Sequence, residues 1–544
     1  MMPSASAPAA ARGLRWPLLV CALFVAAAVA VLQHVVVIRN GGQFSYAIDD
    51  AYIHMAIAKN VVQHHTWGIS DHDFSLASSS PLWTGILAVG YSVIGPKDYL
   101  PLMLNCVFML LALCLAHAVL VESGVSGVLL LTALLLFTFV TPLLGLAFAG
   151  MEHILHIVLS LAYLRVLLAL LAGPRGTIGA GRLGLWTLCS FLLPVARYEG
   201  LFFIAIGCVF LILWRAWLPA LLTLVASGLS ISAVGLYSMA HGGYFLPNSV
   251  LLKGKTDLFG ASSIAQFAQW AGTAALSSVK SPHVFLLIGG MLLLYATGIR
   301  AHGLWSKRQL GLLVVSLVFL LHMAFGAAGS FNRYEAYLVA LSLLAIAGAL
   351  LPGLMSTPAR LTWPVVAYGV VGLYLALPLL ARGFEGAFRV PDACANVHDQ
   401  QVKMGAFVKK YYNDAAVALN DVGAVGYMSD ARIVDLMGLG SNDVARLRKT
   451  KALSTQNIEQ LAERAGVALA IVYDKAFTGK RSLPSAWVRV AAWKIPNRFV
   501  CWDDTVTFYA LQPDEVARLS EALRAYSAEL PRGVSVTLFQ TPGP

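Results

Sequence analysis

Two adjacent carboxylates follow the first long apolar segment of this chain. Asp49 and Asp50 follow the apolar run 16–38, and His54 comes one helical turn later. A carboxylate beside a bound hydroxyl can accept its proton, which is the task of a general base in group transfer. Capping of the helix expected over 51–64 explains one such acid. Two acids beside a histidine at a membrane boundary favour a functional site, because ionisable groups there are often functional.

Basic side chains occur at several later boundaries between apolar and polar segments. They are Arg197, Lys253, Lys255 and Arg333, and Glu152, Glu199, Asn248 and Tyr334 lie near them in the sequence. Guanidinium and ammonium groups can hold a phosphate and stabilise it as it leaves. For each cation alone, a side chain that extends to the water surface is an equal explanation. Ser80 before Pro81 predicts a capped helix start, whose free amide groups also suit a phosphate.

The composition is that of a membrane protein. Of the 544 residues, 58% are hydrophobic and only 12% are charged, whereas a soluble domain carries about 25% charged residues. The net charge of +11 fits the excess of Lys and Arg that membrane proteins carry for topological reasons. We therefore expect membrane lipids, and no nucleic acid, as partners.

About eleven apolar segments approach the roughly 20 residues that a membrane-spanning helix needs. They are 16–38, 100–121, 126–148, 151–172, 183–196, 199–214, 217–239, 282–299, 310–328, 335–352 and 361–381. Segment 81–95 is shorter and suits an interfacial helix as well as a span. If it does not span, every loop rich in Lys or Arg and poor in acids falls on the cytoplasmic side, as the positive-inside rule requires. This topology places the loop 39–99 and the C-terminal tail outside the cytoplasm.

From residue 382 the chain becomes more polar and predicts a small α/β domain. The pattern predicts helices at 400–412 and 455–465, strands at 415–419, 433–437 and 467–473, and a hairpin over 499–511 that turns at Asp503-Asp504. The expected fold is thus a polytopic α-helical membrane bundle of about 11 transmembrane helices (1–381, with first outer loop 39–99). An α/β domain (382–544) follows it on the outer side.

The cysteines give one expectation about the tail. Cys394 and Cys501 are the only cysteines of the tail, and the compartment outside the cytoplasm is oxidising, so we expect a disulfide between them. Two free or buried thiols are the alternative. No zinc-type spacing occurs among the seven cysteines, and no metal site is assigned. His54, His153 and His156 leave a divalent cation open as a cofactor, although their spacing is not specific for one.

The order of these motifs resembles that of the class-C (GT-C) glycosyltransferases. Three stretches are similar to the first outer loop of the bacterial group that contains cell-wall arabinofuranosyltransferases: Asp-Asp-Ala-Tyr-Ile-His at 49–54, Gln-His-His-Thr-Trp-Gly at 63–68 and Ser-Ser-Ser-Pro-Leu-Trp at 78–83. Lys59 stands where that group usually has Arg, and Ser79 where it has Thr. Further matching stretches follow in the same order at 150–152, 197–200, 246–249 with Lys253, 333–334, 420–427 and 433–439.

This resemblance implies an inverting glycosyltransferase with a polyprenyl-phosphate sugar as its donor and a glycan, lipid or protein hydroxyl as its acceptor. It implies a multi-pass protein of the bacterial inner (plasma) membrane, active on the outer face in cell-envelope glycan assembly. Asp49 or Asp50 would be the catalytic base, and family precedent favours the first. The donor- and substrate-binding residues would be His54, Ser80, Glu152, Arg197, Glu199, Asn248, Lys253, Lys255, Arg333 and Tyr334. Asp421 and Asp435 are interpreted as turn and strand-end residues.

Two other functions stay open at this point. A transporter of a small solute or lipid is expected to carry charges along a pathway and often paired repeats, whereas here the charges cluster at one membrane face and no repeat is apparent. A non-catalytic protein of envelope assembly is the other alternative. Convergence of Asp49, Glu152, Lys253 and Arg333 in one place favours the enzyme over both.

Overall fold

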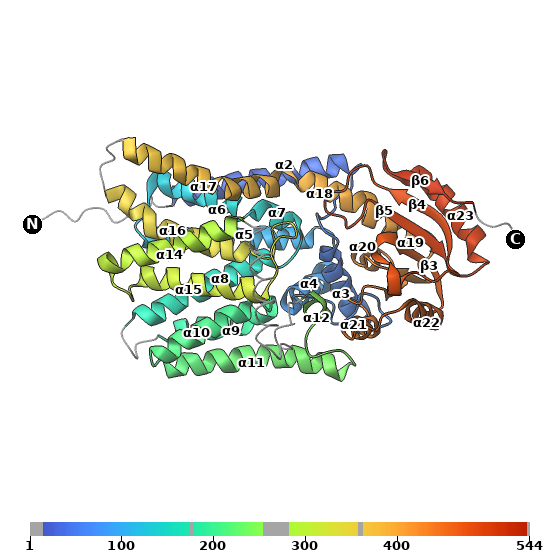
Figure 1. The fold of residues 1–544 in the computed structure, drawn as a ribbon, viewed down its shortest axis with the longest axis horizontal. Coiled ribbons are helices and arrows are strands. Elements are labelled where there is room, and N and C mark those ends of the chain that lie inside the picture. The colour runs from blue at the N-terminus through green and yellow to red at the C-terminus, as the bar shows by residue number, and fades with distance from the viewer. Residues whose placement is uncertain (1–14, 174–178, 254–281, 357–362, 541–544) are drawn as a thin grey trace, which may run out of the picture.

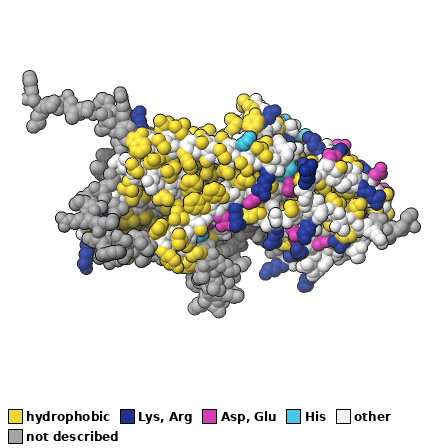
Figure 2. All heavy atoms as spheres, turned by 90° about the horizontal axis from the view of Figure 1, so that it is seen from above, with side chains coloured by type: hydrophobic (Ala, Val, Ile, Leu, Met, Phe, Trp, Pro, Cys, Tyr) yellow, Lys and Arg dark blue, Asp and Glu magenta, His cyan; other side chains and the backbone are white. Residues whose placement is uncertain are grey.

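A helical bundle and an α/β domain at one end of it make up the molecule (Figure 1). The structure, a computed structural model, describes residues 15–173, 179–253, 282–356 and 363–540. Hydrophobic side chains cover much of the bundle, whereas charged side chains gather on the other half (Figure 2). An apolar surface of this extent needs lipid around it. The chain is therefore a multi-pass membrane protein with a C-terminal domain in water.

Every predicted apolar segment folds as helix, which satisfies the backbone internally where no water can. These helices are α2 (Trp16–Arg39), α5 (Leu100–Glu122), α6 (Gly127–Val140) with α7 (Leu143–Phe148), α8 (His153–Ala172), α9 (Ala180–Ala196), α10 (Gly200–Leu213), α11 (Trp217–Ala240), α14 (Pro282–His302), α15 (Lys307–Phe325), α16 (Ala336–Ser356) and α17 (Trp363–Phe388). In the described part of the chain, 7 helices are long and apolar enough to cross a membrane: α2, α5, α8, α11, α14, α15 and α16. Because α6, α9 and α10 are shorter, the predicted number of about 11 spans is not confirmed by this measure.

The loop 39–99 contains two helices, α3 (Asp50–His64) and α4 (Pro81–Ile94). α3 is the amphipathic helix that the sequence predicts over 51–64. α4 has 14 residues and is therefore about 21 Å long, which is less than the roughly 30 Å thickness of the hydrocarbon core. A short helix of another loop, α12 (Asn248–Lys253), lies near α3 and α4 in Figure 1.

The tail is built on a six-stranded mixed sheet in the order β2-β1-β3-β5-β4-β6. The strands are β1 (Ala416–Leu419), β2 (Arg432–Asp435), β3 (Val467–Val472), β4 (Val488–Lys494), β5 (Thr505–Ala510) and β6 (Ser535–Leu538). β1 pairs in parallel with β2 and β3, and the other pairs are antiparallel. The helices are α18 (Val390–Val397), α19 (Lys403–Tyr411), α20 (Gly423–Met428), α21 (Asn442–Lys449), α22 (Thr455–Ala465) and α23 (Glu515–Tyr526). The predicted α/β domain is thus confirmed.

The predicted hairpin at Asp503-Asp504 is wrong. The antiparallel partners of β5 are β3 and β4, and neither of them lies in 499–504; the two acids directly precede β5. Residues just before them form a loop because Asn396 of α18 holds their backbone: its side chain donates to Asn497 O at 2.6 Å and accepts from Val500 N at 3.1 Å. A backbone that bonds to a side chain in this way cannot also pair in a sheet.

The predicted disulfide is also wrong, because Cys394 and Cys501 are free thiols. Cys394 belongs to α18, which packs against α2, and its side chain lies in the hydrophobic core of the bundle. Cys501 lies in the loop before β5 and donates to Gln401 Oε1 at 3.4 Å. The two cysteines therefore belong to different packing environments, although both are buried.

The amphipathic helix α3 contributes to the core of the tail domain. One face of the sheet is covered by α21 and α22, whose Val444 and Ile458 are buried there. On the other face, Phe407 of α19 and Leu523 of α23 form one buried cluster with Ile53 and Ile57 of α3. The apolar face of α3 thus points into the tail domain, and the two parts of the chain share a core.

Helix α20 of the tail is held at both of its ends by residues of the loop 39–99. Asp49 accepts from Gly423 N through Oδ2 and from Ala424 N through Oδ1, both at 2.8 Å. At the other end, Lys59 Nζ donates to two backbone carbonyl oxygens at 3.1 Å each and to Asp430 at 3.1 Å. A carboxylate at the N-terminus and an ammonium at the C-terminus complement the helix dipole. We call this arrangement the α20 clamp.

The α20 clamp requires glycine at position 423. A Cβ there would lie 2.2 Å from the backbone oxygen of Asp49, so Gly423→Ala must push α20 away from α3. We expect a destabilisation of about 1–3 kcal/mol, as for other overpacked sites, measured by thermal unfolding of the detergent-solubilised protein. Gly289→Ala in α14 is the control, because its Cβ would meet nothing within 4 Å. Equal midpoints for Gly423→Ala and the wild type would contradict the clamp.

Candidate active site

Two guanidinium groups lie over the ring of Tyr334. Cζ of Arg333 is 5.0 Å and Cζ of Arg197 is 5.6 Å from the ring centroid. Arg197 follows α9 and Arg333 precedes α16, and each residue is only 5% exposed. Two buried like charges in contact with one ring need acids beside them, because an unpaired buried charge is costly.

Asp50 supplies the acid for Arg333. Its Oδ2 accepts from Arg333 Nη2 at 2.7 Å, and its side chain is 27% exposed. Burial alone would lower the pKa of Arg333, but the charge of Asp50 raises it overall. The same guanidinium directs Nη1 at the sulfur of Met151, 2.8 Å away. Asp50, the first residue of α3, therefore fixes where the charge of Arg333 sits.

Arg197 is held between two carboxylates. Its Nη1 donates to Glu152 Oε1 at 2.7 Å, and its Nη2 and Nε donate to the two oxygens of Glu199 at 2.7 and 3.2 Å. Such bidentate pairing fixes the orientation of the guanidinium as well as its position. Burial alone would raise the pKa of Glu199, but Arg197 holds it at about 2. Arg197 and Glu199 are thus a charged pair at neutral pH.

Glu152 has one oxygen engaged and one that faces a neutral histidine. Oε1 accepts from Arg197 and, at 3.2 Å, from Ser79 Oγ. Oε2 is 3.5 Å from His54 Nε2 and has no hydrogen-bond partner among the described residues. Burial lowers the pKa of His54, whose Nδ1 lies 2.9 Å from Thr84 Oγ1. The free lone pairs of Oε2 could accept a hydrogen bond from a bound hydroxyl.

Asp49 lies beside a second acid, which comes from the tail domain. Asp421 accepts from Tyr473 OH at 2.7 Å and from Gln401 Nε2 at 2.9 Å. Burial first, and then the charges of Asp421 and Asp50, raise the pKa of Asp49 to about 8 in spite of its two amide donors. Burial likewise raises the pKa of Asp421. Neighbouring buried carboxylates disfavour each other's ionised form, so the protonation of Asp49 depends on that of Asp421.

The loop that carries Arg333 has an unusual backbone. At each of residues 330–332, none of them glycine, φ lies between +50° and +60°, which costs about 1–2 kcal/mol per residue. Arg382 Nη2 donates to Asn332 O at 2.7 Å and to Glu335 Oε1 at 3.0 Å. Burial alone would raise the pKa of Glu335, but Arg382 and other partners hold it at about 2. This buried pair fixes the strained loop.

Most of the predicted site residues come together. Those linked by direct contacts are Asp50, His54, Glu152, Arg197, Glu199, Arg333 and Tyr334, which we call the acid–arginine cluster. Asp49 is next to Asp50 in the chain and faces the tail. The described residues contain no group of three His, Cys, Asp or Glu side chains that could hold a metal ion.

Four predicted residues lie elsewhere or are not described in full. Ser80 accepts from Trp83 N at 3.2 Å and thus caps α4. Asn248 donates to Leu439 O at 3.1 Å and to Asn442 Oδ1 at 3.0 Å, which fastens α12 to the tail domain. The backbone of Lys253 ends α12, while Lys255 lies outside the described residues.

The sequence interpretation missed two features of the site. Asp421 was assigned to a turn, and Glu335 with Arg382 was not recognised. One signal was available, since Arg-Tyr-Glu occurs at 197–199 and again at 333–335, each time directly before a helix. Asp435 does end a strand, as predicted, and accepts two backbone amides at 2.6 Å.

Comparisons with known proteins agree with this architecture. A family model described as "Domain of unknown function (DUF8728)" matches residues 395–509. No curated protein sequence matches the chain. Among solved structures, ArnT from Cupriavidus metallidurans in the apo state is similar with a TM-score of 0.50 at 13% identity, over 90% of this chain and 98% of ArnT.

Two further structures align over the same share of this chain. ArnT bound to undecaprenyl phosphate gives a TM-score of 0.49 at 13% identity, over 90% of this chain and 98% of that one. The mycobacterial arabinofuranosyltransferase AftD gives 0.43 at 13% identity, and the match spans 90% of this chain but 41% of AftD. The likeness to apo ArnT shows the fold: the chain has the GT-C-like fold that its motifs predict.

The pair of Glu335 and Arg382 gives a test of how the loop at 330–332 is held. Both side chains are at most 5% exposed, so Glu335→Gln leaves Arg382 without its closest acid and should destabilise the protein by about 3–5 kcal/mol. Thermal unfolding in detergent measures this. Glu385→Gln, on the same helix as Arg382, removes an ion pair to Arg389 with both side chains about half exposed and should change stability by less than about 1 kcal/mol. Equal effects of the two substitutions would contradict the assignment.

Proposed function

We propose that this protein is an inverting membrane glycosyltransferase that moves a sugar from a polyprenyl phosphate to an acceptor hydroxyl. The observation that carries the proposal is the acid–arginine cluster, which brings acids and cations from four separate loops together under the tail domain. The GT-C-like fold supports the same conclusion. We assign the reaction to the outer face of a bacterial plasma membrane, because the distribution of Lys and Arg among the loops favours that side for the tail.

Arg333 and Arg197 would bind the phosphate of the donor, a lipid phosphate of the class that ArnT binds. Both cations are desolvated, and a buried guanidinium stabilises phosphate charge far better than a hydrated one. Arg333 Nε has no hydrogen-bond partner among the described residues, so this guanidinium retains a donor for a ligand. Asp50 would neutralise Arg333 until the donor arrives.

Asp49 would be the general base, with its carboxylate as the proton acceptor. The acceptor oxygen attacks the anomeric carbon from the face opposite the phosphate, its O–H proton passes to Asp49, and the C–O bond to the phosphate breaks. The products are the glycoside and the polyprenyl phosphate, whose new charge rests on the arginines. A carboxylate with a pKa raised to about 8 is a strong base for this step, since catalytic groups work best near ambient pH.

Glu152 and His54 would hold the hydroxyl groups of the sugar. The unpartnered Oε2 of Glu152 accepts one hydrogen bond, and neutral His54 beside it is a second polar contact. Asn248 is proposed as a positioning residue, because its contacts fasten α12 to the tail. Lys253 and Lys255 follow on the same segment and are proposed as further donor-phosphate contacts.

The proposal is tested by incubating the purified protein with labelled polyprenyl-phosphate sugars and a membrane extract as acceptor. The labelled products are then analysed. Asp49→Asn should reduce transfer by about 10²–10⁴-fold, the usual contribution of a general base. Arg333→Ala should weaken donor binding. Asp71→Asn in the same outer loop, with its side chain 31% exposed, is the control and should leave transfer unchanged. The absence of transfer from every class of polyprenyl-phosphate sugar would overturn the proposed function.

Asp49 also belongs to the α20 clamp, so a second control separates chemistry from docking. An asparagine has one acceptor oxygen where aspartate has two, and Asp49→Asn therefore loses an amide contact to α20. Asp430→Asn weakens the other end of the clamp at Lys59 without touching the site. If both variants lose transfer equally, Asp49 acts through docking and another group is the base.

The pH profile gives an independent test of the base. Because the base acts when ionised, transfer should rise with pH through its pKa. Asp421→Asn removes a neighbouring negative charge, lowers the pKa of Asp49 and should move the acidic limb of the rate profile to lower pH. Asp435→Asn, another buried acid of the tail, should leave the limb in place. An unchanged profile in Asp421→Asn would rule out Asp49 as the titrating base.

A further inference from the structure

A second polar cluster lies at the end of the bundle away from Arg333. It consists of Glu122 at the end of α5, Arg165 on α8 and Lys307 at the start of α15. α15 has 19 residues and is about 28 Å long, and its C-terminal end leads into the loop of Arg333. The two polar clusters are thus separated by about the thickness of a membrane.

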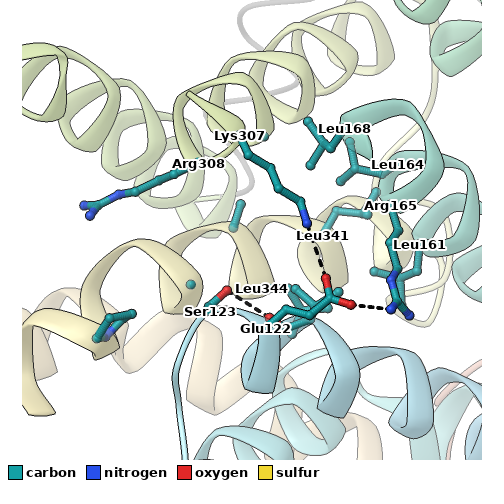
Figure 3. Close-up of a pocket in the computed structure, with 15 residues that line it drawn as sticks. Glu122, Ser123, Leu161, Leu164, Arg165, Leu168, Lys307, Arg308, Leu341 and Leu344 are labelled. Carbon is teal, nitrogen blue, oxygen red and sulfur yellow. Dashed lines mark hydrogen bonds and ion pairs between the residues drawn. The ribbon is translucent and has the colours of Figure 1, made fainter. Parts of the chain in front are cut away.

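A cavity of about 380 Å³ adjoins this second cluster, between α5, α8, α15 and α16. Leucines of α8 and α16 form much of its wall, and Ala345, Gly348 and Pro352 of α16 line it on the same helix face. The small residues make the space: a Cβ on Gly348 would lie 2.9 Å from Ser123 Oγ. The walls are apolar apart from the charged residues and Ser123 (Figure 3).

The side chains of Arg165 and Lys307 both reach the carboxylate of Glu122 (Figure 3). The carboxylate of Glu122 pairs with Arg165 Nη2 and lies 3.3 Å from Lys307 Nζ. Arg308 also lines the cavity, although its side chain points away from Glu122. Three cations against one acid leave a net charge of +2. Arg165 and Lys307 are 39% and 50% exposed, so both can still reach a ligand.

We propose that this cavity binds an anionic phospholipid. The phosphate would lie between Arg165 and Lys307, where guanidinium and ammonium donors can reach its oxygens. One acyl chain would fill the space along Leu164 and Leu344. The site is independent of the proposed transfer reaction, which takes place at the other end of the bundle.

The chemistry of the cavity selects this occupant among lipids and solutes. A polar solute would leave the leucine wall without a matching surface, and inorganic phosphate would not use it at all. A zwitterionic lipid brings its own cation next to Arg165 and Lys307, which repel it. An anionic lipid matches both the net positive charge and the apolar wall.

Native mass spectrometry of the full-length protein, titrated with phosphatidylglycerol or phosphatidylcholine, tests the proposal. The wild type should retain phosphatidylglycerol and not phosphatidylcholine. Arg165→Gln and Lys307→Gln should each weaken phosphatidylglycerol binding about fivefold, the usual effect of one cation near an anionic lipid. Arg182→Gln is the matched control, since Arg182 is exposed and does not line the cavity.

Two more variants keep the test decisive if the arginine or lysine variants fold poorly. Glu122→Gln removes the competing acid and should tighten phosphatidylglycerol binding about fivefold. Gly348→Leu fills the apolar space, leaves every charge in place and should abolish retention. Equal retention of the two lipids, or phosphatidylglycerol binding that none of the four cavity variants alters, would overturn the proposal. Binding of inorganic phosphate with the same dependence on Arg165 and Lys307 would overturn its lipid part.

Discussion

The clamp on helix α20 is the interaction on which the properties of the site depend. Asp49 and Lys59, both from the loop 39–99, hold the two ends of a helix that belongs to the tail. By covering Asp49, the docked tail removes water from it and brings Asp421 close, and these are the causes of its raised pKa. Without the tail the same aspartate would be an ordinary solvated acid. A contact between the two parts of the chain thus sets the protonation of Asp49.

Acidic and basic side chains alternate in the acid–arginine cluster, so that each guanidinium contacts at least one carboxylate. Asp50 pairs with Arg333, and Arg197 pairs with Glu152 and Glu199, with the ring of Tyr334 between the two guanidinium groups. Each charge is compensated before any ligand binds, so the buried charges remain tolerable. The same pairing fixes the two cations in advance, which would lower the reorganisation that the proposed transfer from a phosphate requires. The strained backbone at 330–332, with its positive φ angles, accompanies the placement of Arg333 in this cluster.

Local pattern was enough to predict the helices and several site residues, but not the contacts between distant segments. Apolar runs predict the bundle helices because a backbone in lipid must satisfy its hydrogen bonds within a helix. The boundaries between apolar and polar segments point to Asp49, Glu152, Arg197 and Arg333. The predictions of the hairpin and of the disulfide were wrong because α18 packs on the bundle. Its Asn396 binds the backbone of the predicted hairpin, and its Cys394 lies in the core of the bundle. Pairs such as Glu335 with Arg382 depend on tertiary proximity, which spacing does not encode.

The shared core has a consequence for how the protein is made. Ile53 and Ile57 emerge from the ribosome early, whereas their partners Phe407 and Leu523 are synthesised only after the whole bundle. Contacts at such long sequence separation form slowly and late. Until the tail has folded, the apolar face of α3 stays uncovered and Asp49 stays hydrated. A truncated chain would therefore carry the Asp49-Asp50 motif without the buried environment that raises the pKa of Asp49.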